Sequence, residues 1–344
     1  MCFALLFVTL PSDMKIVRNI INVLMPLVLG GGILYWMYRG ENLDHIIYMI
    51  QHEMNWTWML LSLPFGVLAQ AFRGWRWRQT LEPTGEKVRS SVAVSSIFMS
   101  YASSLVIPRI GEFMRCAILK RWDGVSFSKA IGTVVTERAV DSIVVLLVTG
   151  STLLFQMSVF GTFFERTGTS VSGIFQSFSV TGYLVTFLCG IAAMILLYML
   201  LRRLSIYNKV KATLSGILEG VLSLRKVKNL PLFLFFTIGI WLSYFLHYYL
   251  TFFCFDFTSD LGLACGLVSF VVGSIAVIVP TPNGAGPWHF AVKTMLILYG
   301  VQDEKALAFV LVVHTLQTIL VIIIGMWAWA RLSFIPHITK TVKL

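Results

Sequence analysis

Long stretches without a charged residue constrain this chain more than any other feature of its sequence. A helix needs about 17–25 residues to cross the hydrocarbon core of a bilayer. Eight uncharged stretches reach that length: Asn19–Tyr38, Met54–Phe72, Ser90–Pro108, Ser142–Phe164, Thr167–Leu201, Asn229–Phe255, Leu261–Val292 and Ala306–Ala330. Since 57% of the 344 residues are apolar and only 12% are charged, a water-soluble enzyme, a disordered tail and a nucleic-acid-binding module are excluded. We predict an all-α, polytopic helical membrane protein.

The first residues and the cysteines are interpreted without a functional role. Residues 1–13 are apolar and lack the basic region of a signal peptide, whereas Lys15 and Arg18 precede an apolar run. We therefore expect residues 1–13 to be a non-native extension ahead of a start at Met14, with a start at Met1 left open. The five cysteines form no CxxC pair, so we interpret them as small buried side chains.

The positions of the Lys and Arg residues indicate the topology. Of the 27, 22 lie before the first stretch, after the second, after the third, within residues 202–228 or at the C-terminus. The positive-inside rule places these groups, and both chain termini, on the cytoplasmic side of the inner (cytoplasmic) membrane. The net charge of +11 therefore reflects topology and anionic lipid headgroups, and we expect no nucleic-acid partner.

Two of the stretches do not fit a single crossing. Basic residues flank Ser90–Pro108 on both sides, so we expect the chain to enter, break near Pro108–Gly111 and return by Lys120. A second break falls at Pro280–Pro287, after which the chain returns toward an acidic loop, Asp303–Glu304. Pro and Gly interrupt helices, and a membrane tolerates the freed backbone groups only against protein or water. The sequence therefore predicts two broken, re-entrant helix pairs.

The two breaks give the halves of the chain the same order of helix, helix, broken pair and helix. Residues 14–164 start inside and residues 183–331 start outside, which predicts an inverted-topology repeat with the broken pairs meeting at a midplane site. We expect residues 165–182 to form an external loop, 208–228 an amphipathic interfacial helix and 332–344 a cytoplasmic tail. A plain bundle of eight or nine helices is the alternative.

Charged residues follow the first break at helical spacing. Arg109, Glu112 and Arg115 recur every three residues and so share one helix face. We expect the returning half-helix to begin near Ile110, with its amide groups beside Arg109. A helix N-terminus next to an Arg binds phosphate well, so we predict a lipid-headgroup site. Helix capping with a salt bridge from Glu112 is the alternative.

Three ionisable residues fall inside the fourth predicted span. If that helix begins near Lys129, Glu137 lies about 12 Å and Asp141 about 18 Å along it, at about 1.5 Å per residue. Arg138 and Asp141 are i,i+3 neighbours on the helix surface. Because such groups are costly to bury, we expect all three to face the protein interior and to serve as a headgroup or proton site. A structural ion-pair lock is the alternative.

The second break carries a further candidate group. Asn283, Gly284 and Gly286 predict a flexible turn that exposes backbone amides. His289 and Lys293 follow one helical turn apart on the same face, where they would attract an anion or move a proton. A histidine that is only hydrogen-bonded in place is the alternative.

Other polar or small residues in the apolar stretches are interpreted as structural. Arg73, Arg76 and Arg78 are interpreted as an interfacial anchor whose side chains reach the headgroups. The remaining residues are His247, His314 and Gln317, interpreted as links between helices, and Gly262 with Gly266, interpreted as a close-packing motif.

Two segments resemble one family of membrane proteins. PRIGEFMRCAILKRWDGVSFSKAIGTVVTERAVD (Pro108–Asp141) and PTPNGAGPWHF (Pro280–Phe290) are similar to the transmembrane region of lysylphosphatidylglycerol synthases and their stand-alone, flippase-like relatives. The resemblance in order and spacing extends from about Arg73 to Arg331. His289 stands where many relatives carry an acidic residue, so a cationic aminoacyl headgroup would meet less negative charge here. The positions that match the family pattern are Arg109, Gly111, Glu112, Arg115, Glu137, Arg138, Asp141, Pro282, Gly284 and Gly286.

The resemblance implies a function in lipid transport. In the two-domain relatives a soluble domain aminoacylates phosphatidylglycerol, and the membrane region is held to move the product between leaflets. Since this chain has no room for that domain, we expect translocation of a phospholipid, an aminoacyl-phospholipid or a polyprenyl-phosphate lipid without synthesis. Two alternatives are an intramembrane enzyme that modifies a lipid headgroup and a non-transporting partner of a lipid-modifying enzyme.

The expected partners follow from the interpretation as a lipid transporter. A membrane lipid is the substrate, while a homo-oligomer and a lipid-modifying enzyme stay open as further partners. The chain contains no HExxH, GxSxG, P-loop, complete GxGxxG or metal-spaced Cys/His cluster. We therefore predict no catalytic residue, metal or cofactor, and movement that is downhill or coupled to an ion.

Overall fold

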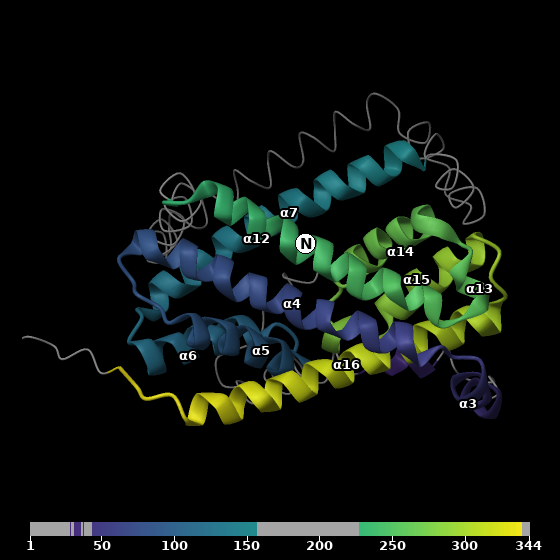
Figure 1. The fold of residues 1–344 in the computed structure, drawn as a ribbon, viewed down its shortest axis with the longest axis horizontal. Helices are drawn as coiled ribbons and strands as arrows, with labels where there is room; N and C mark the ends of the chain where they lie inside the picture. Colours follow the sequence, from purple (N-terminus) through teal and green to yellow (C-terminus); the bar gives the residue numbers. More distant parts are fainter. Residues whose placement is uncertain (1–27, 29–30, 36, 38–42, 157–226, 339–344) are drawn as a thin grey trace, which may run out of the picture. The chain divides into compact units, whose positions relative to one another are not determined.

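The regular structure of the described residues is helical. The computed structural model describes residues 28, 31–35, 37, 43–156 and 227–338 (Figure 1). These ranges contain helices and no strand, which confirms the predicted all-α class. Within them, three helices are long and apolar enough to cross a membrane: α7 (Phe127–Phe155), α12 with its continuation η4 (Leu230–Cys254) and α16 (Asp303–Ser333). The extension 1–13, the loop 165–182 and most of the interfacial helix 208–228 lie outside the described residues.

The chain divides into two compact units. The first comprises residues 1–131 and 228–344, and the second comprises residues 132–227. Both breaks belong to the first unit, whereas α7 continues from the first unit into the second. The predicted division into halves at residues 164 and 183 stays a prediction.

Asparagine side chains start two long helices of the first unit. Asn55 precedes α4 (Trp56–Leu81), and its side-chain oxygen accepts the amide of the second residue after it, at 3.0 Å. Asn229 precedes α12 (Leu230–Tyr249) and accepts the amide of the third residue after it, at 3.1 Å. Such caps satisfy amides that have no partner within the first turn of a helix.

Small residues let α4 and α12 pack closely against each other (Figure 1). A Cβ added at Gly66 would lie 2.8 Å from the imidazole of His247. The same imidazole is hydrogen-bonded through Nδ1 to the carbonyl of Ser62, at 2.9 Å. Gln317 of α16 donates to the His247 carbonyl at 3.4 Å, so both residues link helices as predicted.

The first break joins two short helices into a hairpin. α5 (Ser90–Val106) and α6 (Ile110–Asp123) pack along each other, and a Cβ added at Gly111 would lie 2.0 Å from the Ser100 carbonyl oxygen. With 14 residues, α6 is only about 21 Å long, too short to cross the hydrocarbon core. The open end is closed by an ion pair between Arg89 and Asp123, at 2.6 Å. The break therefore falls where Pro108–Gly111 predicts it.

The second break forms a corresponding hairpin. α14 (Gly262–Ala276) and α15 (Pro287–Leu298) pack together and have 15 and 12 residues, again too few for a full crossing. The short helix η5 (Pro282–Gly284) lies between them. A Cβ at Gly266 would lie 2.4 Å from the Tyr249 ring, whereas Gly262 has open space around it. The close-packing interpretation thus holds for Gly266 only.

The open ends of the two hairpins lie at opposite ends of α16. Near its start, Asp303 pairs with Lys293 of α15 at 2.7 Å. Near its end, the Leu332 carbonyl accepts the indole N–H of Trp122 of α6, at 2.9 Å. Asp303 and Glu304 form the first turn of this helix and not the expected loop, because carboxylates there offset the helix dipole. An inverted repeat requires opposed hairpins of this kind, and the repeat itself stays a prediction.

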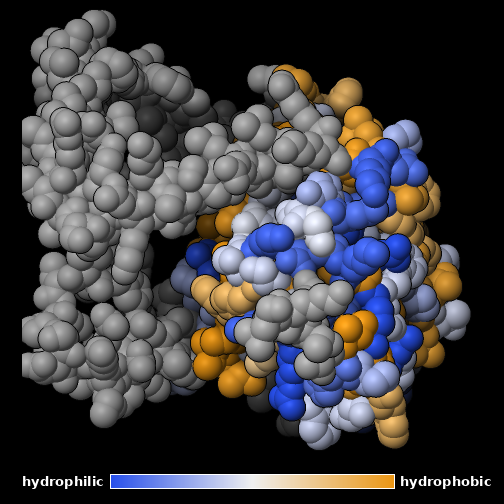
Figure 2. Space-filling view, turned by 90° about the vertical axis from the view of Figure 1, so that its left-hand side faces the viewer, coloured by the Kyte–Doolittle hydropathy of each residue, from blue (hydrophilic) through white to orange (hydrophobic). Residues whose placement is uncertain are grey.

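Polar side chains gather at one end of the first unit. Figure 2 shows hydrophilic residues on this end and hydrophobic residues around it. Exposed basic residues in this region are Arg78, Lys87, Lys120, Arg121 and Lys129, all from the predicted cytoplasmic groups. Lys228 lies 2.8 Å from the exposed Glu82, and its hydrogen bond and positive charge lower the pKa of that carboxyl. One end of this membrane protein is therefore basic. That this end faces the cytoplasm stays a prediction.

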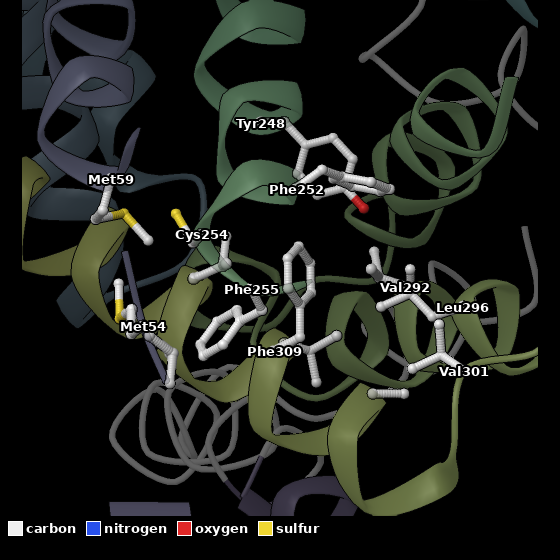
Figure 3. Packing of buried hydrophobic residues seen from close by; sticks show 14 of the residues in the cluster. Met54, Met59, Tyr248, Phe252, Cys254, Phe255, Val292, Leu296, Val301 and Phe309 are labelled. Carbon is white, nitrogen blue, oxygen red and sulfur yellow. The ribbon is translucent and has the colours of Figure 1, made fainter. Parts of the chain in front are cut away.

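A hydrophobic cluster joins α12 and η4 to the second hairpin and to α16 (Figure 3). Phe252 and Phe255 lie edge-on to Phe309 of α16, with ring centroids 5.4 and 6.3 Å apart. Because lipid tails are as apolar as these side chains, close packing and not exclusion from water stabilises such contacts. The cysteines of the described residues are Cys116, Cys254 and Cys265, all buried and free, as interpreted.

Candidate functional site

The two breaks meet at one hydrogen bond. The guanidinium of Arg109 donates through Nη2 to the carbonyl oxygen of Ile278, at 3.0 Å. Arg109 precedes α6 with a φ of 66°, a left-handed conformation that costs energy for a residue other than Gly. Its side chain stays exposed, and a guanidinium has five N–H donors, so further donors remain for a ligand.

The first amides of α6 have partners within their own hairpin. The Ile110 amide donates to the Ile107 carbonyl and the Gly111 amide to the hydroxyl of Ser104, both at 3.2 Å. Two of the amides expected to bind phosphate at this helix N-terminus are therefore hydrogen-bonded within the hairpin. The side chain of Arg109 is the cationic group that this break presents at its exposed side.

The charged residues after the break do not share one environment. Arg115 is 1% exposed and lies over the ring of Trp77, 4.5 Å from the guanidinium carbon to the centroid. Glu112 is half-buried. Since Arg109 lies before the helix in a left-handed conformation, it does not continue the repeat that Glu112 and Arg115 follow. The spacing predicts one helix face for Arg109, Glu112 and Arg115. Arg109 does not lie on that face, because its backbone is not helical.

Side chains hold the second break in a defined turn. Asn283 has a φ of 51°, and its amide nitrogen donates to the hydroxyl of Thr318 on α16, at 2.8 Å. The carbonyl oxygen of Asn283 is bonded to Nε2 of His314, at 3.0 Å. The amide of Gly286 donates to Nδ1 of His289, at 3.4 Å. The turn expected to expose backbone amides is thus tied to α15 and α16.

Two histidines lie side by side next to this turn. The ring centroids of His289 and His314 are 4.4 Å apart, and Trp288 lies against His314 at 5.3 Å. His314 links α16 to the break, as predicted, but its contact with His289 was not foreseen. The only sign in the sequence is a polar residue in an apolar helix, which does not name its partner.

Lys293 has a different partner from His289. Its ammonium lies 2.7 Å from the Asp303 carboxylate, and its side chain is 15% exposed. His289 is buried and packs on His314. His289 and Lys293, predicted to act together, therefore make separate contacts: His289 with His314 and Lys293 with Asp303.

The interpretation of Arg73 and Arg76 as a headgroup anchor is wrong. They are 3% and 0% exposed, and Arg76 donates through Nη1 to the hydroxyl of Thr237 on α12, at 3.4 Å. The Arg73 guanidinium lies 6.0 Å from the ring centre of Tyr244, also on α12. Packing of α12 over this face of α4 buries both residues, whereas Arg78 is exposed as expected.

Three ionisable residues of α7, Glu137, Arg138 and Asp141, lie in the second unit. Glu137 and Asp141 are buried, and Arg138 approaches Asp141 at 4.0 Å, which confirms the predicted i,i+3 pair. The expectation that all three residues face the interior is wrong for Arg138, whose side chain is 47% exposed. A long Arg side chain carries its charge away from its own backbone position. That these residues join the site at the breaks stays a prediction.

The fold and the site define a class: a polytopic helical membrane protein with two broken helix pairs whose tips touch. The family model described as the lysylphosphatidylglycerol synthase transmembrane region matches residues 23–325, and the chain belongs to this family. No curated protein and no solved structure matches the chain. Membership places the protein among membrane proteins of lipid metabolism.

Proposed function

We propose that this protein translocates a lipid with an anionic or phosphate-bearing headgroup between membrane leaflets. The supporting observation is the bond from Arg109 to the Ile278 carbonyl, which joins the tips of two hairpins too short to cross the bilayer. Half-helices that end inside the membrane leave polar backbone groups next to a polar path, where transporters bind their substrates.

Arg109 is the headgroup-binding residue of this proposal. A guanidinium forms two parallel hydrogen bonds with a phosphate, and Arg109 is exposed at the junction while one nitrogen bonds Ile278. A phospholipid, an aminoacyl-phospholipid and a polyprenyl phosphate all present this phosphate chemistry.

The remaining predicted site residues also serve lipid passage in this proposal. Those of the first unit belong to the two breaks, and those of the second unit are the ionisable residues of α7. Together these residues are Glu112, Arg115, Glu137, Arg138, Asp141, Asn283, Gly284, Gly286, His289 and Lys293. Movement is downhill or coupled to an ion.

Reconstitution tests the proposal. Purified protein is placed in phosphatidylcholine–phosphatidylglycerol liposomes with a trace of NBD-phosphatidylglycerol, and dithionite bleaches the outer leaflet. Wild-type protein is expected to expose the inner-leaflet probe to dithionite. Arg109→Ala is expected to slow this by at least about tenfold, because a hydrogen bond to a charged group contributes about 1.5–3 kcal/mol.

Two controls make the result specific. Arg78→Ala removes an exposed Arg from the same basic end and is expected to leave the rate unchanged. Arg109→Lys keeps the charge without the planar fork and is expected to be intermediate. A folded Arg109→Ala protein with the wild-type rate contradicts the proposed site. Wild-type protein that moves neither this probe nor a fluorescent polyprenyl phosphate contradicts the proposed function.

A further inference from the structure

His289 and His314 hold the two ends of the second break. His289 bonds the Gly286 amide, where α15 begins, and His314 bonds the Asn283 carbonyl within the turn. The rings lie against each other with centroids 4.4 Å apart, and both histidines come from helices that pack together. The conformation of the break thus depends on one pair of imidazoles.

The partners of the rings define where their protons are. A carbonyl oxygen only accepts, so Nε2 of His314 carries a proton and donates it to Asn283. Nδ1 of His314 lies 3.5 Å from the Thr318 hydroxyl, which accepts from Asn283 through one lone pair and has its own hydrogen and a second lone pair for the ring. A backbone amide only donates, so Nδ1 of His289 accepts from Gly286. The His289 ring is therefore neutral in this arrangement.

A proton on Nδ1 of His289 breaks the contact of that ring with the break. The nitrogen becomes a donor that faces the Gly286 amide, which is also a donor. At His314 the Thr318 hydroxyl accepts from a protonated Nδ1 through its second lone pair, so that contact persists with its direction reversed. Two imidazolium rings 4.4 Å apart would repel, so the pair takes up one proton.

We propose that His289 and His314 form a proton-binding site whose protonation opens the second break. The coupling of this step to lipid movement rests on the proposed function, whereas the opening does not. An opened break shifts Ile278 relative to Arg109, and so links the proton to the junction of the two hairpins. The proton is then the coupling ion of translocation.

The segments that carry the second break supply no carboxylate. α14, the break at residues 277–286 and α15 contain no Asp or Glu. α16 carries two carboxylates, Asp303 and Glu304, both in its first turn. Asp303 bonds Lys293, which lies one helical turn from His289. Tyr248 of α12 faces Trp288 at 6.1 Å, and Arg109 reaches the break through Ile278.

Hydrogen–deuterium exchange reads the opening directly. Full-length protein in nanodiscs of phosphatidylcholine and phosphatidylglycerol is labelled between pH 7.5 and pH 5.0, and exchange of residues 277–290 is corrected for the chemical rate. An imidazole released to water takes up a proton below about pH 6.5. If opening takes up one proton, the corrected exchange rate of this segment rises by up to about tenfold for each pH unit below about pH 6.5.

Matched variants isolate the two rings. His289→Asn keeps an acceptor for the Gly286 amide, and His314→Gln keeps a donor for the Asn283 carbonyl, but neither titrates. The double variant is expected to exchange this segment at a rate that does not depend on pH. His52→Gln removes an exposed histidine of α3 (Leu43–His52) and is expected to keep the wild-type dependence. Exchange in wild type that is independent of pH overturns the proton site.

Translocation at two pH values tests the coupling. Liposomes with short-chain NBD-phosphatidylglycerol are assayed at pH 7.5 and pH 5.5 by albumin extraction of the probe. Wild type is expected to move the probe about tenfold faster at pH 5.5, and the double variant at equal rates. Opening without an effect of pH on translocation overturns the coupling. No lipid movement at any pH, with pH-dependent exchange, overturns the proposed function and supports the proton site.

Discussion

Single residues set how closely the half-helices approach one another. At Gly111 an added Cβ would lie 2.0 Å from a backbone carbonyl of the facing helix, a neighbour that has little freedom to move. At Gly325 of α16 it would lie 2.3 Å from the Cβ of Ala102. Where lipid tails remove the hydrophobic driving force between helices, close contact of this kind is what stabilises their association.

Gly111→Ala is expected to destabilise the protein by about 1–3 kcal/mol, because the first hairpin has to separate to admit a methyl group. Thermal unfolding of the detergent-solubilised protein measures this as a lower Tm. Gly150→Ala is the matched control, since nothing lies within 4 Å of the added Cβ on α7. It is expected to raise stability by about 0.5–1 kcal/mol. Equal Tm values for the two variants would contradict the packing described.

At the scale of elements, Arg89 closes the open end of the first hairpin. Its side chain bonds the Asp123 carboxylate at 2.6 Å and the Trp122 carbonyl at 2.9 Å, and its amide bonds Asp123 at 2.9 Å. The same guanidinium donates to the Pro336 carbonyl after α16, at 2.9 Å. One residue therefore ties the start of α5 to the ends of α6 and α16.

Asp123→Asn is expected to cost about 1–3 kcal/mol, because the carboxylate is buried and its loss leaves Arg89 without its charged partner. Thermal unfolding at pH 7 measures the change. Glu82→Gln removes an ion pair with Lys228 in which both side chains are exposed, so only a small fall in Tm is expected at pH 7. An equally large drop in Tm for Glu82→Gln and Asp123→Asn would contradict the prediction that the buried ion pair contributes more stability than the exposed one.

The pH of that comparison matters because Lys228 lowers the pKa of Glu82. A lowered pKa contributes stability above the ordinary carboxyl pKa, about 4.3 for Glu, and this contribution is lost as the pH falls. Any difference between wild type and Glu82→Gln is therefore expected at pH 7 and absent well below pH 4. The two unfolding curves, recorded at both pH values, provide the check.

For the whole molecule, the opposed hairpins and the basic end define two faces. α16 runs from Asp303, beside the second hairpin, to the end at which the first hairpin opens. With 31 residues it is about 46 Å long, enough to span a bilayer with its headgroups. The two ends of this helix are therefore expected on opposite sides of the membrane.

Cysteine labelling tests this arrangement in a variant without the five native cysteines. Ser128→Cys lies exposed at the basic end and Gln302→Cys lies exposed at the other. A membrane-impermeant maleimide is expected to label position 302 in intact spheroplasts and position 128 only in inverted vesicles. Labelling of both positions from one side would contradict the spanning topology.

Local chemistry was enough to predict several parts of the structure. The helical class follows from apolar length, and the positions of the breaks follow from Pro and Gly, because both act on the backbone where they stand. The start of α6 at Ile110 and the pair of Arg138 with Asp141 follow from helix geometry over a few residues.

Tertiary structure decided the contacts between distant segments. Arg109 and Ile278 are 169 residues apart, and no local rule pairs them. The meeting of His289 with His314 and the burial of Arg73 and Arg76 also depend on which helix covers which face. The structural type of each segment could be predicted from its residues alone, because helix length, charge and backbone breaks are local properties. Only packing decided which polar groups share a site, because that depends on the side chains that neighbouring helices bring together.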